Sequence, residues 1–312
     1  MFADNLSLNH TERASYTDDE MSQVFDNPIF IVSAPRAGST LLFELMSSAF
    51  TFHTIGNESH SIYGQFPSLA KENAQFDSGC LTEEHANPTL CNELRHAFIT
   101  SLIDHHGFPM NKSQLLSAKN TIAFLEKTPR NSLNIPFLLK VFPKARFIYL
   151  HRQACENVSS LIEAWHFSQQ TGHFVTFTDL PNWPLKRWCF LLPPGWRNYR
   201  GKSIAEIASF QWRASNNIIL SELNKLPKQR WTAINYQDLI TQPQQALQKL
   251  ANFCQVNATG VLPHLTVDNL PYSSTTLTKP NENKWRKHEA LLAPFMDHYR
   301  QEEKNIHRLV TQ

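Results

Sequence analysis

The sequence predicts a single α/β domain in which a central parallel sheet carries helices on both faces. Short apolar runs rich in Ile, Val and Phe alternate along the chain with longer segments whose apolar residues follow helical spacing. Strands that alternate with helices favour parallel pairing, because each helix returns the chain to the start of the next strand. The 312 residues contain no internal repeat, low-complexity block or change of composition that would mark a linker, so we expect one domain.

Five segments are predicted to be strands, because they are short, apolar and bounded by turn residues. The clearest are residues 29–34 (IFIVSA) and 145–150 (ARFIYL). The first runs into a turn that contains glycine, and the second runs directly into a helix. The others are expected at residues 51–55, 121–125 and 231–236.

Helices are predicted where apolar residues recur every three or four positions. Ser39 and Thr40 open the first helix, and Asn87 before Pro88 is a typical cap and first residue of another. The remaining helices are expected over residues 136–142, around 158–165, over about 204–226, over 243–254, and from about 289 onward.

Two stretches depart from this alternation. Residues 1–27 are polar and acidic, and we expect them to be an N-terminal extension of a folded domain at residues 28–312. Residues 166–200 are rich in Trp, Phe and Pro and show little periodicity. This segment is predicted to be either a lid over a substrate pocket or a loop packed around a small core of its own, and both alternatives stay open.

Composition narrows the possible partners and location. A net charge of +2 gives no reason to expect nucleic acid or a membrane surface as partner, so any anion site must be local. The five scattered cysteines favour reduced thiols, and no apolar run suits a signal peptide or a membrane span. We therefore expect a cytoplasmic protein. The histidines lack metal-ligand spacing, and no metal is expected.

The first candidate anion site is the turn at residues 35–40 (PRAGST). A strand that enters a helix through a glycine-containing turn aims free backbone N–H groups and the positive helix end at an anion. Gly38 lets the backbone approach a phosphate, Ser39 and Thr40 add hydroxyls, and Arg36 adds charge. The turn is P-loop-like, but it is no Walker A loop because no lysine follows Gly38. An ordinary strand–helix turn capped by Ser39 is the alternative.

The second candidate anion site follows the strand at residues 145–150. Arg152 stands just beyond its end, and Ser160 lies eight residues later in the following helix. An arginine at a strand end can pair bidentately with a phosphate while a hydroxyl two turns away closes the clamp. The alternative is an ordinary surface arginine and a mid-helix serine.

Residues 33–42 (SAPRAGSTLL) resemble the 5′-phosphosulfate loop of sulfotransferases that use 3′-phosphoadenosine-5′-phosphosulfate (PAPS), with the form P-R-[SA]-G-[ST]-T-L-L. Arg152 and Ser160 resemble the 3′-phosphate motif of the same family, although Gln153 and Ala154 replace its usual D-P or D-G. The likeness is to bacterial-type members and, distantly, to tyrosylprotein sulfotransferases. It implies nucleotide contacts from Arg36, Ala37, Gly38, Ser39, Thr40 and Leu41 on the 5′ side and from Arg152 and Ser160 on the 3′ side.

Two further segments resemble catalytic segments of the family. Residues 56–60 (GNESH) are similar to the G-E-E segment of tyrosylprotein sulfotransferases, which implies that Glu58 is the base. His60 is the rival, because its ordinary pKa suits base catalysis. Residues 126–129 (EKTP) are similar to the family's E-K-T-P or K-D-P segment, which implies that Lys127 joins Arg36 at the transferred group.

The C-terminal part carries two weaker likenesses. Residues 235–239 (NYQDL) resemble the family's Y-E-D-L, and Tyr236 could lie near the nucleotide or simply pack in the core. Residues 273–286 resemble the segment that folds back over the nucleotide, which implies contacts from Ser274 and from Lys284 or Arg286.

The resemblance implies transfer of a sulfuryl group from PAPS to a hydroxyl or amine of a small-molecule or peptide acceptor, with PAP as product and no metal. Two alternatives stay open. A nucleoside or nucleotide kinase on a related fold is disfavoured because the Walker lysine and an obvious magnesium carboxylate are missing. A catalytically silent module would bind PAP without transferring anything. The sequence names neither the acceptor nor the oligomeric state.

Overall fold

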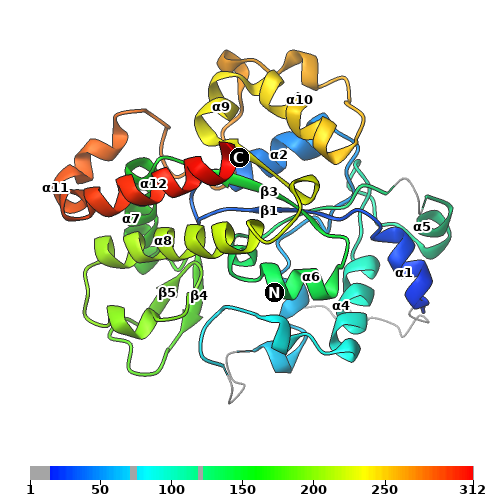
Figure 1. Cartoon of the computed structure of the whole chain (residues 1–312), viewed down its shortest axis with the longest axis horizontal. Coiled ribbons are helices and arrows are strands. Elements are labelled where there is room, and N and C mark those ends of the chain that lie inside the picture. The colour runs from blue at the N-terminus through cyan, green and yellow to red at the C-terminus, as the bar shows by residue number, and fades with distance from the viewer. Residues whose placement is uncertain (1–14, 71–75, 119–121, 312) are drawn as a thin grey trace, which may run out of the picture.

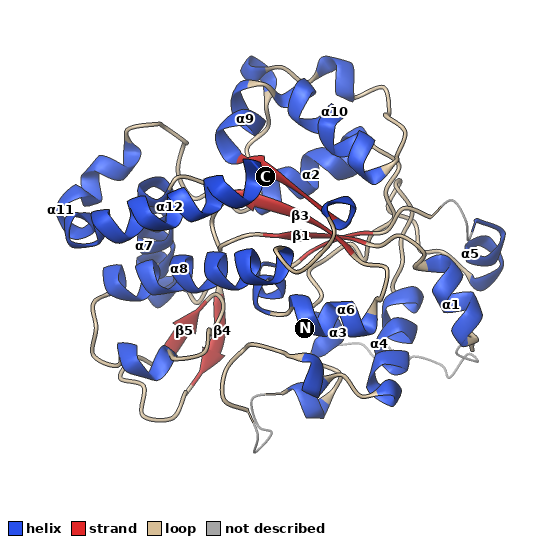
Figure 2. Ribbon diagram, viewed as in Figure 1, coloured by secondary structure: helices blue, strands red, loops and turns tan. Residues whose placement is uncertain are grey.

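The computed structural model describes residues 15–70, 76–118 and 122–311, and its centre is a parallel sheet flanked by helices (Figures 1 and 2). The predicted α/β class and single domain are confirmed. The sheet has four strands in the spatial order β2-β1-β3-β6. They are β1 (Ile29–Val32), β2 (Leu125–Lys127), β3 (Arg146–His151) and β6 (Trp231–Asn235).

The described helices lie before, between and after these strands. Most of them occupy the predicted segments, and the helix expected over residues 243–254 has those bounds. They are α1 (Asp18–Val24), α2 (Ser39–Ala49), α3 (His60–Tyr63), α4 (Pro88–Thr100), α5 (Lys112–Ala118), α6 (Ile135–Val141), α7 (Ala154–Thr171), α8 (Ile204–Leu223), α9 (Tyr236–Thr241), α10 (Pro243–Cys254), α11 (Glu289–Leu292) and α12 (Met296–Thr311).

Both faces of the sheet are buried, because successive side chains of a strand point to opposite sides. Phe30 and Phe147 join the larger core, which includes residues of α4, α6, α7 and α8. Ile29 and Ile31 join a second core with residues of α2, α9 and α10. Figure 1 shows these two helical layers on opposite sides of the sheet. Burial on both faces explains why the strands are continuous apolar runs.

The strand order places the two predicted anion motifs side by side. After β1 the chain leads to β2 on one side, whereas after β3 it leads to β6 on the other. Connections that leave in opposite directions open a crevice at the carboxyl ends of the two central strands, where open α/β sheets bind ligands. The turn at residues 35–38 follows β1, and Arg152 follows β3, so both motifs flank this crevice.

The segment at residues 166–200 is packed into the domain, and its role as a lid stays a prediction. It contains the end of α7 and an antiparallel hairpin of β4 (Val175–Thr178) and β5 (Arg187–Cys189). Trp188 is fully buried between Trp183 and Trp196, with ring centroids 4.7 and 5.9 Å away. The cluster is not a separate core, because Trp188 and Trp196 belong to the larger core and Trp183 packs against it. Other residues of the hairpin line the cavity described below.

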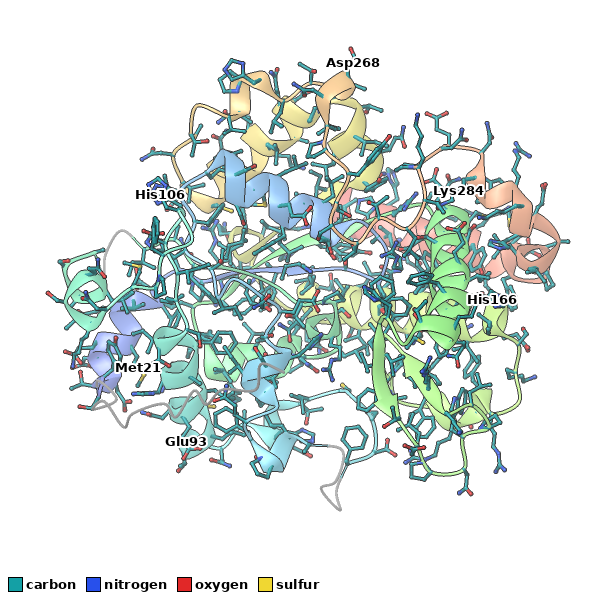
Figure 3. All side chains as sticks on the ribbon, turned by 180° about the vertical axis from the view of Figure 1, so that it is seen from behind. Met21, Glu93, His106, His166, Asp268 and Lys284 are labelled. Carbon is teal, nitrogen blue, oxygen red and sulfur yellow. The ribbon has the colours of Figure 1, made fainter. Side chains whose placement is uncertain are left out.

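The N-terminal residues that the structure describes are not detached from the domain. Thr17 caps α1 in a capping box with Glu20, and Met21 and Val24 on its inner face are buried in the larger core. In the view from behind, α1 with Met21 lies at the opposite side of the molecule from Lys284 (Figure 3). Residues 1–14 of the expected extension lie outside the described residues, and the boundary at residue 28 stays a prediction.

The predicted strand at residues 51–55 was wrong. Only isolated bridges form there, in which His53 pairs with Phe124 and Thr54 with Ile103. The two residues turn to different neighbours, so the pairing never extends along one partner. The strand expected at residues 121–125 begins instead at Leu125 and ends at Lys127; residue 121 lies outside the described residues.

The cap predicted for α4 gives a test of the fold. The Asn87 side chain accepts a hydrogen bond of 2.9 Å from the Leu90 N–H. We expect Asn87→Ala to lower the free energy of unfolding by about 1 kcal/mol in urea denaturation followed by circular dichroism. Asn87→Asp keeps the acceptor and should recover most of the loss. An equal loss in both variants would contradict the role of the cap.

Candidate active site

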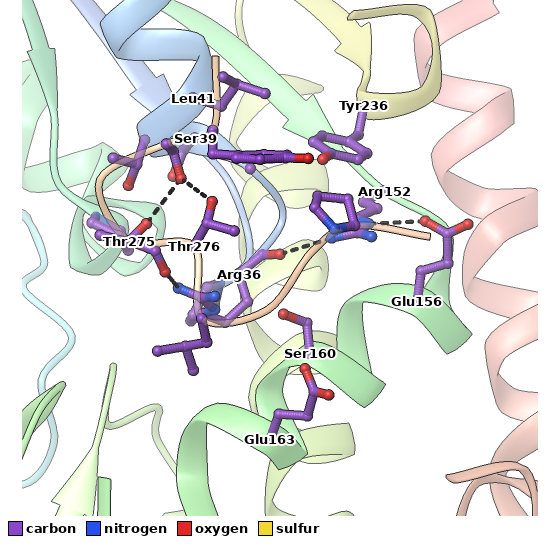
Figure 4. A pocket seen from close by; sticks show the side chains of 18 of the residues that line it. Arg36, Ser39, Leu41, Arg152, Glu156, Ser160, Glu163, Tyr236, Thr275 and Thr276 are labelled. Carbon is purple, nitrogen blue, oxygen red and sulfur yellow. Dashed lines mark hydrogen bonds and ion pairs between the residues drawn. The ribbon is translucent and has the colours of Figure 1, made fainter. Parts of the chain in front are cut away.

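A cavity of about 550 Å³ opens at the carboxyl ends of β1 and β3. Its walls come from the turn after β1, the start of α2, the middle of α7 and the start of α9. The β4–β5 hairpin adds the residues around the start of β4 and those that follow β5. The segment at residues 267–285 supplies much of the remaining lining, and Figure 4 shows part of it beside the turn. Polar and apolar side chains therefore meet in one enclosed space.

The turn after β1 is built to leave backbone N–H groups free. Arg36 and Gly38 have φ angles of 63° and 111°, so the chain reverses sharply before α2 begins. No side chain caps α2, and the first-turn N–H groups of Ser39, Thr40 and Leu41 have no partners within the helix. The positive end of α2 therefore faces the cavity and can hold an anion. The Ala37 N–H differs, because it donates to Ala34 O at 3.3 Å.

Gly38 is required by a close contact as well as by its φ angle. A Cβ at this position would lie 2.5 Å from ring atoms of Tyr236. Tyr236 begins α9 directly after β6, and its ring also faces the Arg152 guanidinium, whose carbon is 4.3 Å from the ring centroid. The tyrosine ring thus lies between the two predicted anion motifs, in a cation–π contact with the second.

Arg152 is oriented by the first turn of α7. Its Nε donates to Glu156 Oε2 at 2.9 Å, and its Nη1 approaches Arg36 O at 3.5 Å. Ser160 lines the cavity on the same helix, as Figure 4 shows, whereas the Ser159 hydroxyl contacts His288 Nδ1 at 2.9 Å. The structure therefore brings Arg152 and Ser160 to the same cavity, as the sequence predicts.

Three cationic side chains converge on this cavity. Arg36 donates from Nη1 to Thr275 O at 3.0 Å, and its buried Nε has no partner among the described residues. Burial and then the charge of Arg152 lower the pKa of Arg36 to about 10. Burial and then the two arginines also lower the pKa of Lys284, although Glu163 pairs with it at 2.8 Å. Cations that repel one another in a shared cavity favour an anionic ligand.

A row of three polar side chains, His60, Glu58 and Lys127, lies at another part of the cavity, where Glu58 and His60 belong to the lining. His60 Nε2 lies 2.8 Å from Glu58 Oε2, and Lys127 Nζ lies 2.5 Å from Glu58 Oε1. Lys127 is only 6% exposed and also donates to Thr40 at 3.3 Å, so it lies beneath the cavity surface. Burial alone would raise the pKa of Glu58, but the hydrogen bond from His60 and the charge of Lys127 outweigh it and lower the pKa to about 2. Glu58 is therefore a carboxylate at neutral pH.

Both nitrogens of His60 are engaged. Arg130 Nε donates to His60 Nδ1 at 3.2 Å, and since a guanidinium can only donate, Nδ1 must be the acceptor. The ring proton then sits on Nε2 and is donated to Glu58. Burial lowers the pKa of His60, and the charge of Arg130 adds to that effect. His60 is therefore neutral near pH 7 and orients the carboxylate.

A buried polar network holds this row in place. Ser59 donates from its N–H to Thr128 Oγ1 at 2.8 Å, and Thr128 in turn donates to Glu126. Asn131 Nδ2 donates to the other oxygen of Glu126 at 2.8 Å. Glu126 is 1% exposed, and burial raises its pKa. Ser59, the residue after Glu58, thus ties the loop that carries Glu58 to the end of β2.

Most predicted site residues reach the cavity. Lining residues include Arg36, Gly38, Ser39, Thr40, Leu41, Glu58, His60, Arg152, Ser160, Tyr236 and Lys284. Ala37 is buried behind the turn, and Ser274 lies outside the lining because its N–H and hydroxyl bind Glu44. Its neighbours Thr275 and Thr276 line the cavity instead.

Sequence reasoning missed several residues of the cavity. Glu156 carried a detectable signal, because it stands four residues after Arg152 and so faces it on the helix. Phe174 and Phe190 lie in the segment at residues 166–200 that was predicted as a possible lid, but the sequence did not single them out. Arg130 carried no signal, because only the packing of distant segments brings it to the cavity.

Two searches of the described residues gave no candidates. No group of three or more His, Cys, Asp or Glu residues within residues 15–70, 76–118 and 122–311 is placed to hold a metal ion. Within the same ranges, no helix is long and apolar enough to cross a membrane.

Comparison with known families decides the assignment. The model of the "Sulfotransferase family" matches residues 28–260. The chain belongs to the sulfotransferase family. The matched region begins at the predicted domain boundary and contains the turn after β1, the Glu58 loop, Lys127, Arg152 and Tyr236.

Solved sulfotransferase structures are similar in fold at low identity. The sulfotransferase domain from the curacin biosynthetic pathway is 19% identical, with 86% of this chain and 97% of that one covered and a TM-score of 0.45. Sulfotransferase STF9 from Mycobacterium avium is 13% identical (88% and 76% covered, TM-score 0.47). A sulfotransferase from Alicyclobacillus acidocaldarius is 10% identical (92% and 96% covered, TM-score 0.45). No curated protein sequence matches.

The contact between Gly38 and Tyr236 can be tested by a double-mutant cycle. We expect Gly38→Ala to lower the free energy of unfolding by about 3 kcal/mol or more, because both the φ angle and the tyrosine ring oppose a Cβ. In the Tyr236→Ala background the ring is absent, and the cost should fall to about 1–2 kcal/mol. Urea denaturation of the four proteins measures both costs. Equal costs in the two backgrounds would contradict the contact.

Proposed function

We propose that this sulfotransferase moves a sulfuryl group from PAPS to a hydroxyl or amine of an acceptor and releases PAP. The observation that carries the proposal is the convergence of Arg36, Arg152 and Lys284 on one cavity at the ends of β1 and β3. The unpartnered Nε of Arg36 and the uncapped start of α2 supply donors for an anion there. One phosphate site beside each central strand fits a nucleotide with phosphates at both its 5′ and 3′ positions.

Each group of donors has its own place in the proposed complex. The N–H groups at the start of α2 and the hydroxyls of Ser39 and Thr40 hold the 5′ side. Arg152 and Ser160 hold the 3′-phosphate, with Glu156 keeping the guanidinium in position. Tyr236 packs against the same guanidinium. Lys284 adds positive charge from the segment that lines the opposite wall.

The proton step is assigned to Glu58. When bound, PAPS supplies a sulfuryl group that is activated by its bond to phosphate. Glu58 takes the proton of the acceptor hydroxyl while that oxygen bonds to sulfur, and the bond between sulfur and the phosphate oxygen breaks. Arg36 and Lys127 stabilise negative charge on the transferred group and on the oxygen that leaves.

The hydrogen bonds of the row favour Glu58 over His60 as base. His60 accepts from Arg130 at Nδ1 and carries its proton on Nε2, so it has no free lone pair. Glu58 is a carboxylate with further lone pairs. Lys127 lies between Thr40 and Glu58, so a shift of its ammonium toward the transferred group raises the basicity of Glu58 when the substrates are in place.

Other features of the assignment follow from the chain's composition. We propose a small-molecule or peptide acceptor and no nucleic-acid or membrane partner, because the net charge is only +2. We also propose a cytoplasmic location, because all five cysteines are free thiols.

Nucleotide specificity tests the donor assignment. We expect calorimetry to give micromolar affinity for PAP. The affinity for ADP should be weaker than that for PAP by about 10-fold or more, because only PAP offers a 3′-phosphate to Arg152. Arg152→Ala should remove this preference. Arg200→Ala, at an exposed arginine outside the cavity lining, is the control for loss of one positive charge and should bind as the wild type.

The other outcomes separate the alternatives. Equal affinity for PAP and ADP, or no affinity for PAP, would contradict the donor assignment and favour the kinase alternative. Binding of PAP without transfer to any acceptor in a panel of phenols, alcohols and amines would favour the silent module.

Turnover tests the base. We expect Glu58→Gln to lower kcat by about 100- to 10,000-fold while its PAP affinity stays within about twofold of the wild type. Formation of PAP from PAPS with the best acceptor of the panel measures kcat. Glu93→Gln, at an exposed glutamate of α4 (Figure 3), is the matched control. Unchanged kcat in Glu58→Gln, or loss of PAP affinity alone, would contradict the base role.

The pH dependence of kcat/KM separates Glu58 from His60. This parameter follows the free enzyme, in which the pKa of Glu58 is lowered to about 2 and that of His60 is lowered from 6.5. With Glu58 as base, the carboxylate persists as pH falls, so we expect no acidic limb between about pH 5 and 8. An acidic limb below pH 6.5 that disappears in His60→Gln would assign the proton step to His60.

A further inference from the structure

Arg130 is a cation of the cavity that the proposed reaction does not use. It follows β2 in a 3₁₀ turn, η3 (Pro129–Leu133), and lines the cavity beside Glu58 and His60. Within the described part of the chain it donates one hydrogen bond, from Nε to His60, and it forms no ion pair there. Burial lowers its pKa. Its two terminal amino groups therefore remain for a ligand at the end of the cavity where the base lies.

An aromatic wall lies across from this end. Phe174 and Phe190 line the cavity at the open end of the β4–β5 hairpin, and their rings stack with centroids 5.3 Å apart. Their φ angles are 57° and 64°, and Phe190 N–H donates to Phe174 O at 3.0 Å. Bulky side chains rarely adopt this conformation, and such strain gathers at functional sites.

The hairpin and its flanks contact two cations of the cavity. The Arg36 guanidinium carbon is 5.1 Å from the Phe174 ring centroid, and that of Arg130 is 5.6 Å from the ring of Phe177 on β4. Three of the six described non-glycine residues with positive φ, namely Arg36, Phe174 and Phe190, line this one cavity. Phe177 lies outside the cavity lining, so its contact holds the Arg130 guanidinium against the hairpin. Phe174 and Phe190 present an apolar surface to the same cavity beside Arg36.

Glu58, His60 and Arg130 lie in a row whose spacing suits a particular shape of ligand. His60 contacts Glu58 through one ring nitrogen and Arg130 through the other. One imidazole ring therefore separates the carboxylate from the guanidinium. A hydroxyl at Glu58 and an anionic group at Arg130 are consequently about one ring apart in an acceptor that lies along this row.

We propose that the acceptor is an aromatic hydroxy acid: its hydroxyl lies at Glu58, its ring packs on Phe174 and Phe190, and its carboxylate pairs with Arg130. This assignment rests on the proposed function, because it places the acceptor hydroxyl at the proposed base. A guanidinium with two free amino groups matches a carboxylate bidentately. The aromatic wall adds a stacking surface for the ring.

The test compares a matched pair of probes, 4-hydroxyphenylacetate and 4-hydroxyphenylacetamide, which differ in charge and not in shape. Each is titrated calorimetrically into the full chain, with and without saturating PAP. We expect the wild type to bind the acid about 10- to 100-fold more tightly than the amide, as for a charge-assisted hydrogen-bonded pair. Arg130→Gln should remove the preference with PAP affinity unchanged, and Arg130→Lys should keep part of it. Arg200→Gln, at an exposed arginine, should bind as the wild type.

Three results would overturn the proposal: equal affinity of the wild type for acid and amide, no binding of either probe, or a preference that survives in Arg130→Gln. Arg130→Lys keeps the decision open to measurement if Arg130→Gln does not fold. Failure of PAP to bind would instead overturn the proposed donor, and the titrations without PAP would still decide the role of Arg130.

Discussion

The cavity depends on holding two arginines of like charge side by side away from bulk water. Arg152 Nη1 lies 3.5 Å from Arg36 O, and the charge of Arg152 helps to lower the pKa of Arg36. Like charges repel more strongly in a poorly solvated space. Glu156, the Thr275 carbonyl and the Tyr236 ring each offset part of that repulsion. Under the proposed function, an anionic ligand in the cavity would relieve the rest and so stabilise the fold.

Nearby charges and burial also determine the ionisation of the two glutamates at the end of the cavity near Glu58. Two neighbouring glutamates have opposite environments: the pKa of Glu58 is lowered by His60 and Lys127, and burial raises that of Glu126. Glu126 receives hydrogen bonds from Thr128 and Asn131, and through Thr128 it helps to hold the loop that carries Glu58. Glu58 is an ionised carboxylate in the cavity lining, as the proposed base requires, while Glu126 helps to position the backbone. Environment, rather than residue type, separates the two roles.

Sequence and structure agree where a function depends on neighbours in the chain. The strand–turn–helix at residues 29–49 and the pair Arg152 and Ser160 are local patterns, and the alternation of strands and helices brought them to one edge of the sheet as predicted. The strand expected at residues 51–55 failed because pairing is not local: His53 and Thr54 turn to different partners.

The parts of the site that sequence could not supply arise from contacts between distant segments. Tyr236 was ambiguous until its ring was seen against Gly38, a contact across about 200 residues of chain. Arg130 joins the cavity only because η3 meets both the Glu58 loop and the hairpin. The positive φ angles of Phe174 and Phe190 leave no mark in a sequence, since nothing in the residue type signals them.

The construction of the hairpin affects how the shape of this cavity can change by substitution during evolution. Its back is the tryptophan cluster of Trp183, Trp188 and Trp196, and its front is the aromatic pair that faces the cavity. Because the interior of the cluster anchors the hairpin, exchange of the front rings alters the shape offered to a ligand while the anchor persists. Stability of the hairpin and ligand preference therefore depend on different residues. Substitutions on its inner surface can change which ligand fits without unfolding the hairpin.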